Sequence, residues 1–316
     1  MHPAYSVIYF TCATGAGYGL LIWLAVFAMM GALPLTPAFG LAGLGVSMAL
    51  VVTGLLSSTS HLGRPERAWR AFSQWRSSWL SREGVFAIAT FVPVAVLALG
   101  WIVEGRSDGV YAVAAAAAAV SALVTVYCTG MIYQSLPTIR AWNLPMVTPI
   151  YLALGLATGA VLMVALMAGF GALAQAHLML TLAVLGGAWL LKFAYWSTID
   201  GAPREWKIGA ATGLGRFGQV RPLDPPHSKP NFVMREMGYQ VARKHALKLR
   251  RMAIALGFAV PAGLLITVLL GGLQAAAFPL AVLAAMSALA GVLVERWLFF
   301  AEAEHVAMLY YGKQEA

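Results

Sequence analysis

The stretch PAFGLAGLGVSMALVVTGLLSSTS, residues 37–60, runs for 24 residues without a charged side chain. A helix of about 20 apolar residues crosses the hydrocarbon core of a bilayer, which is roughly 30 Å thick. The stretch is rich in Leu and Ala and lacks the alternation of apolar and polar residues that is typical of barrel strands. It is therefore predicted to form a transmembrane helix.

The rest of the chain has the same character. Of its 316 residues, 60% are hydrophobic and only 10% are charged, a composition that excludes a water-soluble domain. We predict an all-α, polytopic bundle of eight transmembrane helices, which forms a single integral membrane domain over residues 1–316. The spans are expected near Tyr5–Gly31, Pro37–Ser60, Glu83–Val103, Gly109–Ser135, Met146–Gly171, Ala174–Trp196, Met252–Gly272 and Ala276–Phe300.

The distribution of basic residues predicts the orientation of the bundle, because positively charged loops tend to remain in the cytoplasm. With eight helices, 18 of the 21 Lys and Arg residues fall in loops or termini of one face. Arg106 falls on the other face, and Lys192 and Arg296 lie inside apparent helix ends. We therefore expect a bacterial inner-membrane protein with both termini, residues 62–82 and the connection 197–251 in the cytoplasm.

A charged stretch, STSHLGRPERAWRAFSQWRSSWLSREG, joins the second and third spans. Pro65 is a favourable first residue of a helix. Apolar side chains then recur at spacings of four, three and four residues: Ala68, Phe72, Trp75 and Trp79. This pattern favours an amphipathic interfacial helix within residues 62–82. The alternative is a loop whose arginines serve only to hold this face in the cytoplasm.

His61 and Glu83 each lie where a span meets this stretch. Reduction of a quinone needs two electrons and two protons, and a His with a pKa near the working pH suits that proton transfer. A partly desolvated Glu at a helix start could pass the second proton. The alternative is structural, with His61 capping one helix end and Glu83 stabilising a helix N-terminus.

The run HLGRP (61–65), then RA (67–68) and LSRE (80–83), resembles the signature of the membrane anchor subunit of dimethyl sulfoxide reductase and its relatives. The resemblance implies a quinone-binding subunit without molybdenum, docked to a four-cluster iron–sulfur subunit and, through it, to a molybdopterin subunit. His61 and Glu83 would be the acid–base pair, and Arg64 an orienting charge. The residues that it places at the quinone site are Ser60, His61, Gly63, Arg64, Arg67, Ser81 and Glu83.

The predicted orientation departs from the dimethyl sulfoxide reductases proper, in which this motif faces outward. An inward-facing complex is similar to the quinone-dependent sulfite dehydrogenases, which the start MHPAYSVIYFT and the segment LGRFGQVRPLDPPHSKPNF also resemble. That branch implies a subunit, not catalytic alone, that passes electrons from cytoplasmic sulfite to the quinone pool. The alternative is an anchor that oxidises menaquinol for a sulfoxide reductase. The direction of electron flow and the choice of ubiquinone or menaquinone depend on the partners.

The long connection 197–251 carries 11 basic and four acidic residues. Such a platform suits an acidic partner surface or anionic lipid. Its candidate docking residues are Trp206, Lys207, Arg216 and Arg221. GLGRFG (213–218) matches a dinucleotide fingerprint, but no strand precedes it, so nucleotide binding is not expected, and neither is a nucleic-acid partner.

Lys192 and Tyr195, near the end of the sixth span, are expected to reach the interface, with an accessory quinone-site role as the alternative. Gly15 and Gly19 form a G-x-x-x-G pattern that favours close helix packing. No metal site and no haem are expected, although His61 and His305 remain a possible haem pair. A structural tether and a secondary transporter are further alternatives. For a transporter, paired broken helices and buried charges in both halves of the chain are not evident.

Overall fold

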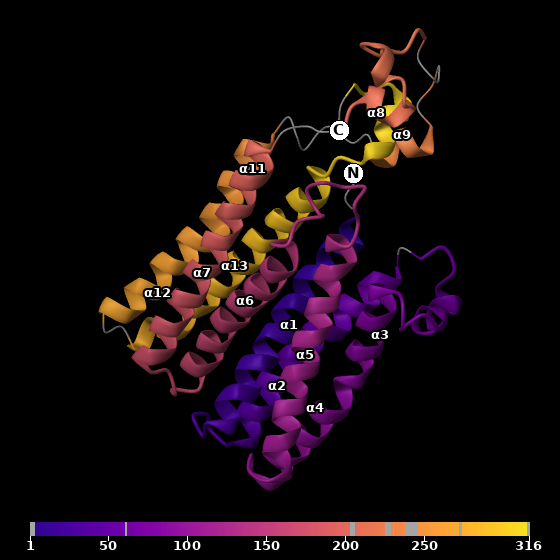
Figure 1. Ribbon diagram of the computed structural model, residues 1–316. Helices are drawn as coiled ribbons and strands as arrows, with labels where there is room; N and C mark the ends of the chain where they lie inside the picture. Colours follow the sequence, from indigo (N-terminus) through magenta and orange to yellow (C-terminus); the bar gives the residue numbers. More distant parts are fainter. Residues whose placement is uncertain are drawn as a thin grey trace.

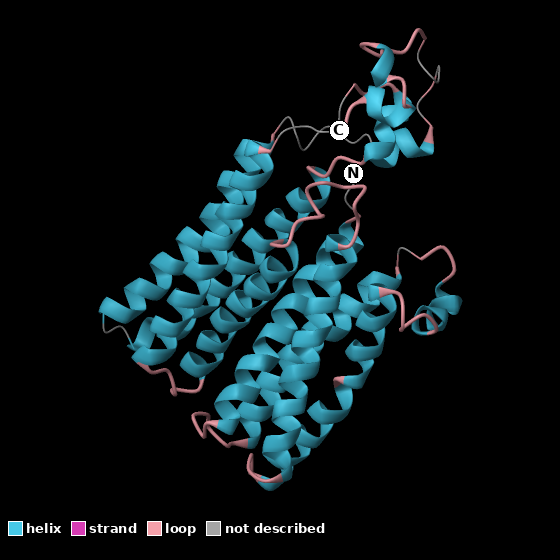
Figure 2. Cartoon of the chain, viewed as in Figure 1, coloured by secondary structure: helices cyan, strands magenta, loops and turns pink. Residues whose placement is uncertain are grey.

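The computed structural model describes residues 4–60, 62–202, 206–224, 229, 231–237, 245–271 and 274–314. Figure 1 and Figure 2 show these residues as long helices joined by short loops, with no strand among them. Within these described ranges, eight helical segments are long and apolar enough to cross a membrane. The prediction of an all-α bundle with eight spans is confirmed.

The eight spans include two that are divided into shorter helical pieces. The spans are α1 (Tyr5–Met29), α2 (Pro37–Thr59), α3 (Trp79–Ala89) with α4 (Phe91–Ala98) and the wider π-helical turn η2 (Leu99–Glu104), α5 (Val110–Gln134), α6 (Val147–Gly169), α7 (Gln175–Gly201), α11 (Ala246–Ile254) with the π-helical turn η4 (Ala255–Ala259) and α12 (Val260–Gly271), and α13 (Gln274–Ala301).

Three predicted ends were wrong by four to six residues. The third span begins at Trp79 instead of Glu83, the sixth continues to Gly201, and the seventh begins at Ala246. In each case polar residues extend the helix beyond its apolar part, because hydrogen bonding within a helix does not require apolar side chains. Ser78 caps α3, since its hydroxyl accepts a hydrogen bond from the Ser81 N–H at 3.4 Å.

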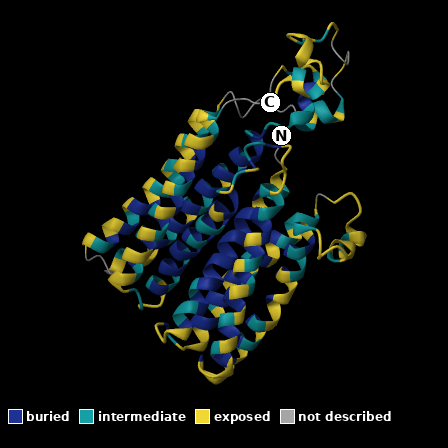
Figure 3. Ribbon diagram, in the orientation of Figure 1, coloured by how far each residue is buried: buried dark blue, intermediate teal, exposed yellow. Residues whose placement is uncertain are grey.

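The spans form two groups of four helices (Figure 1). The first group contains α1, α2, α3 with α4, and α5, and the second contains α6, α7, α11 with α12, and α13. α1 and α6 are buried along most of their length, whereas the outer helices expose one side, as Figure 3 shows. The two groups therefore join mainly through α1 and α6.

Glycines allow the close contact between α1 and α6. Gly15 and Gly19 of α1 face Gly155 and Gly159 of α6, and a Cβ atom added at Gly19 would overlap the Gly155 carbonyl oxygen. The Trp23 indole also donates a hydrogen bond to the Leu156 carbonyl at 2.9 Å. The predicted role of Gly15 and Gly19 in close helix packing is confirmed.

The segment 62–82 differs from the single amphipathic helix that its pattern predicted. A 3-10 helix, η1 (Pro65–Phe72), ends before Trp75 and Trp79, and the chain turns before α3. Phe72 points to Gly84, where an added Cβ would lie 2.9 Å from its ring, while Trp75 is exposed. The aromatic residues therefore do not share one face. Arg82 holds the turn by donating a hydrogen bond to the Trp75 carbonyl at 3.0 Å.

The connection 197–251 is shorter than predicted, because α7 and α11 extend into it. Its described middle contains three short helices: α8 (Ile208–Thr212), η3 (Gly215–Phe217) and α9 (Phe232–Met237). α8 and α9 both contact η5 (Val306–Tyr311) near the end of the chain. The Tyr310 hydroxyl donates a hydrogen bond to the Ala211 carbonyl at 2.9 Å. These pieces form a small cap at the end of the bundle where α1 begins and α13 ends (Figure 1).

Candidate functional site

Glu83 lies one turn inside α3 and is buried, with 4% of its surface exposed. The Thr129 hydroxyl of α5 donates a short hydrogen bond to its Oε1 atom. Because α3 begins at Trp79, the carboxyl group points into the first group of helices instead of standing at a helix start. The structural alternative, a Glu that stabilises a helix N-terminus, fits this position poorly, because Glu83 accepts its hydrogen bond from a neighbouring helix.

An apolar cavity of about 550 Å³ adjoins Glu83. α1, α2, η1, α3 and α5 enclose it, and it is hereafter called the apolar cavity. Leu80 and Ile88 of α3 line it and are also more than half exposed on the outer surface of the bundle. The cavity therefore reaches the side of the protein that faces lipid. Its polar or charged lining comes mainly from Ser58, Thr59, Arg64, Arg67, Glu83 and Tyr133.

The structure brings several predicted site residues together at this cavity. Gly63, Arg64, Arg67 and Glu83 all line it. Arg64 and Arg67 are exposed on η1 and its approach, so their guanidinium groups can reach both the cavity mouth and water. These four residues of the predicted site therefore lie around one cavity.

Two other predicted residues of the motif, Ser60 and Ser81, do not line the cavity. Ser81 is buried in the first turn of α3, and Ser60 follows the end of α2, where its hydroxyl donates to the Ser57 carbonyl at 2.7 Å. His61 lies outside the described residues, so its role as an acid–base residue or as a haem ligand remains a prediction. His305, the other member of the possible haem pair, accepts a hydrogen bond through Nδ1 from the Ala307 N–H at 3.0 Å.

Two residues of α5 were missed by the sequence analysis. Thr129 bonds to Glu83, and Tyr133, one turn further on, lines the cavity. With Thr125 they stand at spacings of four residues, which places them on one face of the helix. This spacing of hydroxyl groups within an apolar span was the signal that could have identified them.

Lys192 and Tyr195 lie in the second group of helices and do not line the apolar cavity. The expectation that Lys192 reaches the interface is wrong. Its side chain is 1% exposed, and its Nζ atom pairs with Glu295 Oε1 at 2.5 Å. The Tyr195 hydroxyl donates to the Ala141 carbonyl at 2.9 Å. Their assignment to the quinone site remains a prediction without a contact to this cavity.

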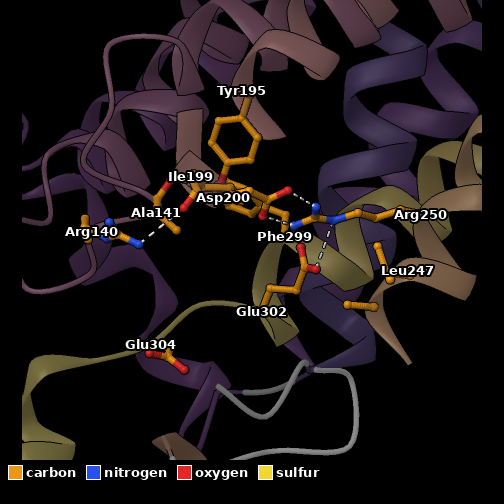
Figure 4. Close-up of a pocket in the computed structure, with 11 residues that line it drawn as sticks. Arg140, Ala141, Tyr195, Ile199, Asp200, Leu247, Arg250, Phe299, Glu302 and Glu304 are labelled. Carbon is orange, nitrogen blue, oxygen red and sulfur yellow. Dashed lines mark hydrogen bonds and ion pairs between the residues drawn. The ribbon is translucent and has the colours of Figure 1, made fainter. Parts of the chain in front are cut away.

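Tyr195 lines a second, polar pocket of about 380 Å³ at the same end of the bundle (Figure 4). Arg250 is central to it and is bonded to two carboxylates, at 2.6 Å from Asp200 and 3.1 Å from Glu302. Burial is the main cause that raises the pKa of the Glu302 carboxyl above its ordinary value, against the opposing effect of Arg250. We call this site the polar pocket.

The four predicted docking residues lie in the cap. Trp206, Lys207, Arg216 and Arg221 are all exposed. The Arg216 guanidinium lies over the Phe217 ring, with its Cζ atom 4.6 Å from the centroid. The cap thus presents basic and aromatic side chains at the end of the bundle that carries both sites.

These features define a multi-pass membrane protein with an apolar cavity, next to a buried carboxyl group, that opens toward lipid. The chain belongs to the DMSO reductase anchor subunit (DmsC) family, whose profile matches residues 1–211. It is also 30% identical to a sulfite dehydrogenase subunit of Allochromatium vinosum, with 98% of this chain and 99% of that protein covered. No solved structure matches the chain. The resemblance drawn from the sequence motif is confirmed.

Proposed function

We propose that this protein is the quinone-reactive membrane anchor of a sulfite-oxidising complex. Its partners would be an iron–sulfur subunit with four clusters and a molybdopterin subunit, both on the cytoplasmic side of the bacterial inner membrane. The observation that carries the proposal is the apolar cavity beside Glu83. The family supports the anchor role, and the similarity to a sulfite dehydrogenase subunit over nearly the full length supports the substrate.

The apolar cavity suits a quinone in size and chemistry. Its volume of about 550 Å³ falls within the range of pockets that hold small molecules, roughly 300–1,000 Å³. Apolar side chains of four spans would hold the ring, and the opening beside Leu80 and Ile88 would let the isoprenoid tail remain in lipid. A quinone could then enter and a quinol leave without crossing water.

The polar groups of the cavity would supply protons and orientation. Glu83 would act as a proton donor or acceptor toward one quinone oxygen, because it is the carboxyl group that lines the cavity. Arg64 would orient the reduced ring through its charge. His61 would form a hydrogen bond to the other oxygen, as the motif predicts. Electrons would arrive from the iron–sulfur partner, which the basic cap would bind.

The test is electron transfer from sulfite to a short-chain quinone in membranes that carry the assembled complex. We expect sulfite to support reduction in the wild type, and His61→Ala at matched assembly to lose it. Failure of sulfite together with quinol-driven reduction of a sulfoxide would keep the anchor role and overturn the sulfite assignment. Unchanged transfer in the His61 variant would return that residue to a structural role.

A bulky side chain in the cavity should weaken quinone binding. Ala71 of η1 lines the cavity, so Ala71→Trp would fill space that the ring needs. We expect the affinity for a short-chain quinone, measured by calorimetry on the purified complex, to fall about tenfold, ~1.4 kcal/mol. Ala89→Trp adds the same bulk on the exposed surface of α3 and should leave the affinity unchanged. Equal affinity in all three proteins would place the quinone elsewhere.

Charge reversal in the cap should loosen the iron–sulfur partner. Arg216 and Arg221 are exposed, and exposed interface charges act mainly on association rate and salt dependence. We expect Arg216→Glu with Arg221→Glu to weaken co-purification of the partner about tenfold and to remove most of its salt dependence. Arg106→Glu, at the opposite end of the bundle, is the control. If both variants retain the partner equally, the basic cap contacts lipid instead.

A further inference from the structure

Three charged residues lie together inside the second group of helices. Lys192 of α7 pairs with Glu295 of α13, and Arg296 Nη1 lies 3.6 Å from Glu295 Oε2. All three side chains are at most 3% exposed. We call them the buried charge cluster. The sequence placed Lys192 and Arg296 inside apparent helix ends, and the structure shows that both side chains are buried there.

Packing alone does not explain why three charged side chains are buried together. Each buried ion loses several kcal/mol of hydration, and buried ion pairs can often be replaced by apolar residues without loss of stability. With Lys192, Glu295 and Arg296 ionised, the cluster has a net positive charge. Ionisable groups within membrane spans are accordingly more often functional than structural.

One end of the buried charge cluster adjoins the polar pocket. Lys192 Nζ lies 4.1 Å from the centre of the Tyr195 ring and 5.8 Å from that of Phe299, and both rings line the pocket. Glu302 and Arg250 line the same pocket (Figure 4). Glu302 is a carboxyl group whose pKa is raised, mainly by burial, so it can exchange protons with water closer to neutral pH than an exposed Glu.

The other end adjoins the apolar cavity through two tyrosines. Arg296 Cζ lies 3.5 Å from the centre of the Tyr151 ring. Tyr151 stacks on Tyr133 with ring centres 5.6 Å apart, and Tyr133 lines the apolar cavity. The Tyr151 hydroxyl and the Arg296 Nε atom make no hydrogen bond to any residue that the structure describes. Both retain hydrogen-bonding capacity at the point where the two groups of helices meet.

We propose that the buried charge cluster, with Tyr151 and Tyr133, conducts protons between the polar pocket and the apolar cavity. The proposal rests on the proposed quinone function. Reduction of one quinone consumes two electrons from the iron–sulfur partner and two protons. Glu83 delivers one proton to the first oxygen. Tyr133 delivers the other to the second oxygen, to which His61 would form a hydrogen bond, and Tyr133 regains a proton through the cluster. Oxidation of a quinol would run the same steps in reverse.

The titratable groups within the buried charge cluster and next to it are compatible with this role. They come from four helices: Cys12 of α1, Tyr151 of α6, Lys192 and Tyr195 of α7, and Arg296 beside Glu295 on α13. Cys12 donates a hydrogen bond to the Val292 carbonyl at 3.7 Å. Glu295 is the carboxylate among these groups. Because its Oε1 atom lies 2.5 Å from Lys192 Nζ, a proton can pass between the two side chains without rearrangement of the helices.

The test uses two variants in the assembled complex. Tyr133→Phe removes the last hydroxyl and preserves the ring stack. Lys192→Met with Glu295→Gln removes the exchanging pair far from the cavity and keeps the net charge of the cluster. We expect each to lower kcat for quinone reduction about tenfold, with KM for quinone changed less than twofold and a larger solvent deuterium isotope effect. A merely structural role would not change the isotope effect.

Tyr127→Phe is the matched control, because Tyr127 lies on the same helix, is 43% exposed and lines neither site. Wild-type rates and isotope effects in the double variant would overturn the proton route. If Tyr133→Phe is slow while the double variant is normal, Tyr133 only contacts the quinone. That result would also overturn the proton route. If the wild type itself reduces no quinone, the proposed function fails instead. Co-purification of the partner subunits reports whether each variant has assembled.

Discussion

Glu83→Gln should lower the rate of quinone-linked electron transfer by about 100-fold to 10,000-fold, the range that a positioned acid or base contributes to a reaction. Gln has the size of Glu and its Oε1 atom can still accept the hydrogen bond from Thr129. It cannot exchange a proton. We therefore expect quinone affinity to change less than the rate, which should appear as a fall in kcat at nearly constant KM.

Glu104→Gln is the appropriate control for this substitution. Glu104 ends the same span at the opposite face of the bundle and is exposed. Its loss should leave turnover, assembly and quinone affinity at wild-type values. Full activity of the Glu83 variant would exclude Glu83 from proton transfer, whereas loss of assembly would assign it to the contact between α3 and α5.

The spans were predictable because the bilayer imposes a length and a polarity on every helix that crosses it. Residues 37–60, for example, carry both signals without interruption, and α2 extends from Pro37 to Thr59. The neighbouring stretch was harder to predict, because its Trp and Arg residues fit both an interfacial helix and a turn. The hydrogen bond from Arg82 to the Trp75 carbonyl, which holds the turn, joins residues seven apart and has no periodic signal in the sequence.

The candidate site was predictable only where its residues lie close together in the chain. The motif from Gly63 to Glu83 forms one side of the apolar cavity, and its grouping followed from sequence. Tyr133 completes the cavity from a helix 50 residues further on, where only the packing of α5 against α3 decides which face is inside.

The pairing of Lys192 with Glu295 could not be predicted for the same reason. It joins helices about 100 residues apart, and its distance depends on the register between α7 and α13. A lysine near a helix end is usually free to bend toward water. Here the surrounding rings of Tyr195 and Trp196 enclose its Nζ atom, at 4.1 and 5.1 Å from their centres, so the side chain remains inside.

Gly19→Leu should prevent the protein from accumulating in the membrane, and Gly19→Ala should lower its stability by about 1–3 kcal/mol, the usual range for overpacking. Lipid tails are as apolar as the helix surfaces, so close contact between small residues is a main source of helix association in membranes. A Cβ atom at Gly19 would overlap the backbone of Gly155, which cannot move like a side chain. The measurement is thermal unfolding of the purified variant in detergent.

Gly45→Ala is the matched control, because a Cβ atom there meets no other atom within 4 Å. It replaces a glycine inside α2 and should leave the protein as stable as the wild type or more stable by up to about 1 kcal/mol. Since α1 and α6 also hold the two groups of helices in register, the Gly19 variants should weaken the stacking of Tyr133 on Tyr151, which joins α5 to α6. Wild-type stability of Gly19→Ala would mean that α1 and α6 are not in close contact, and the proton route between the two groups of helices would then lack its path.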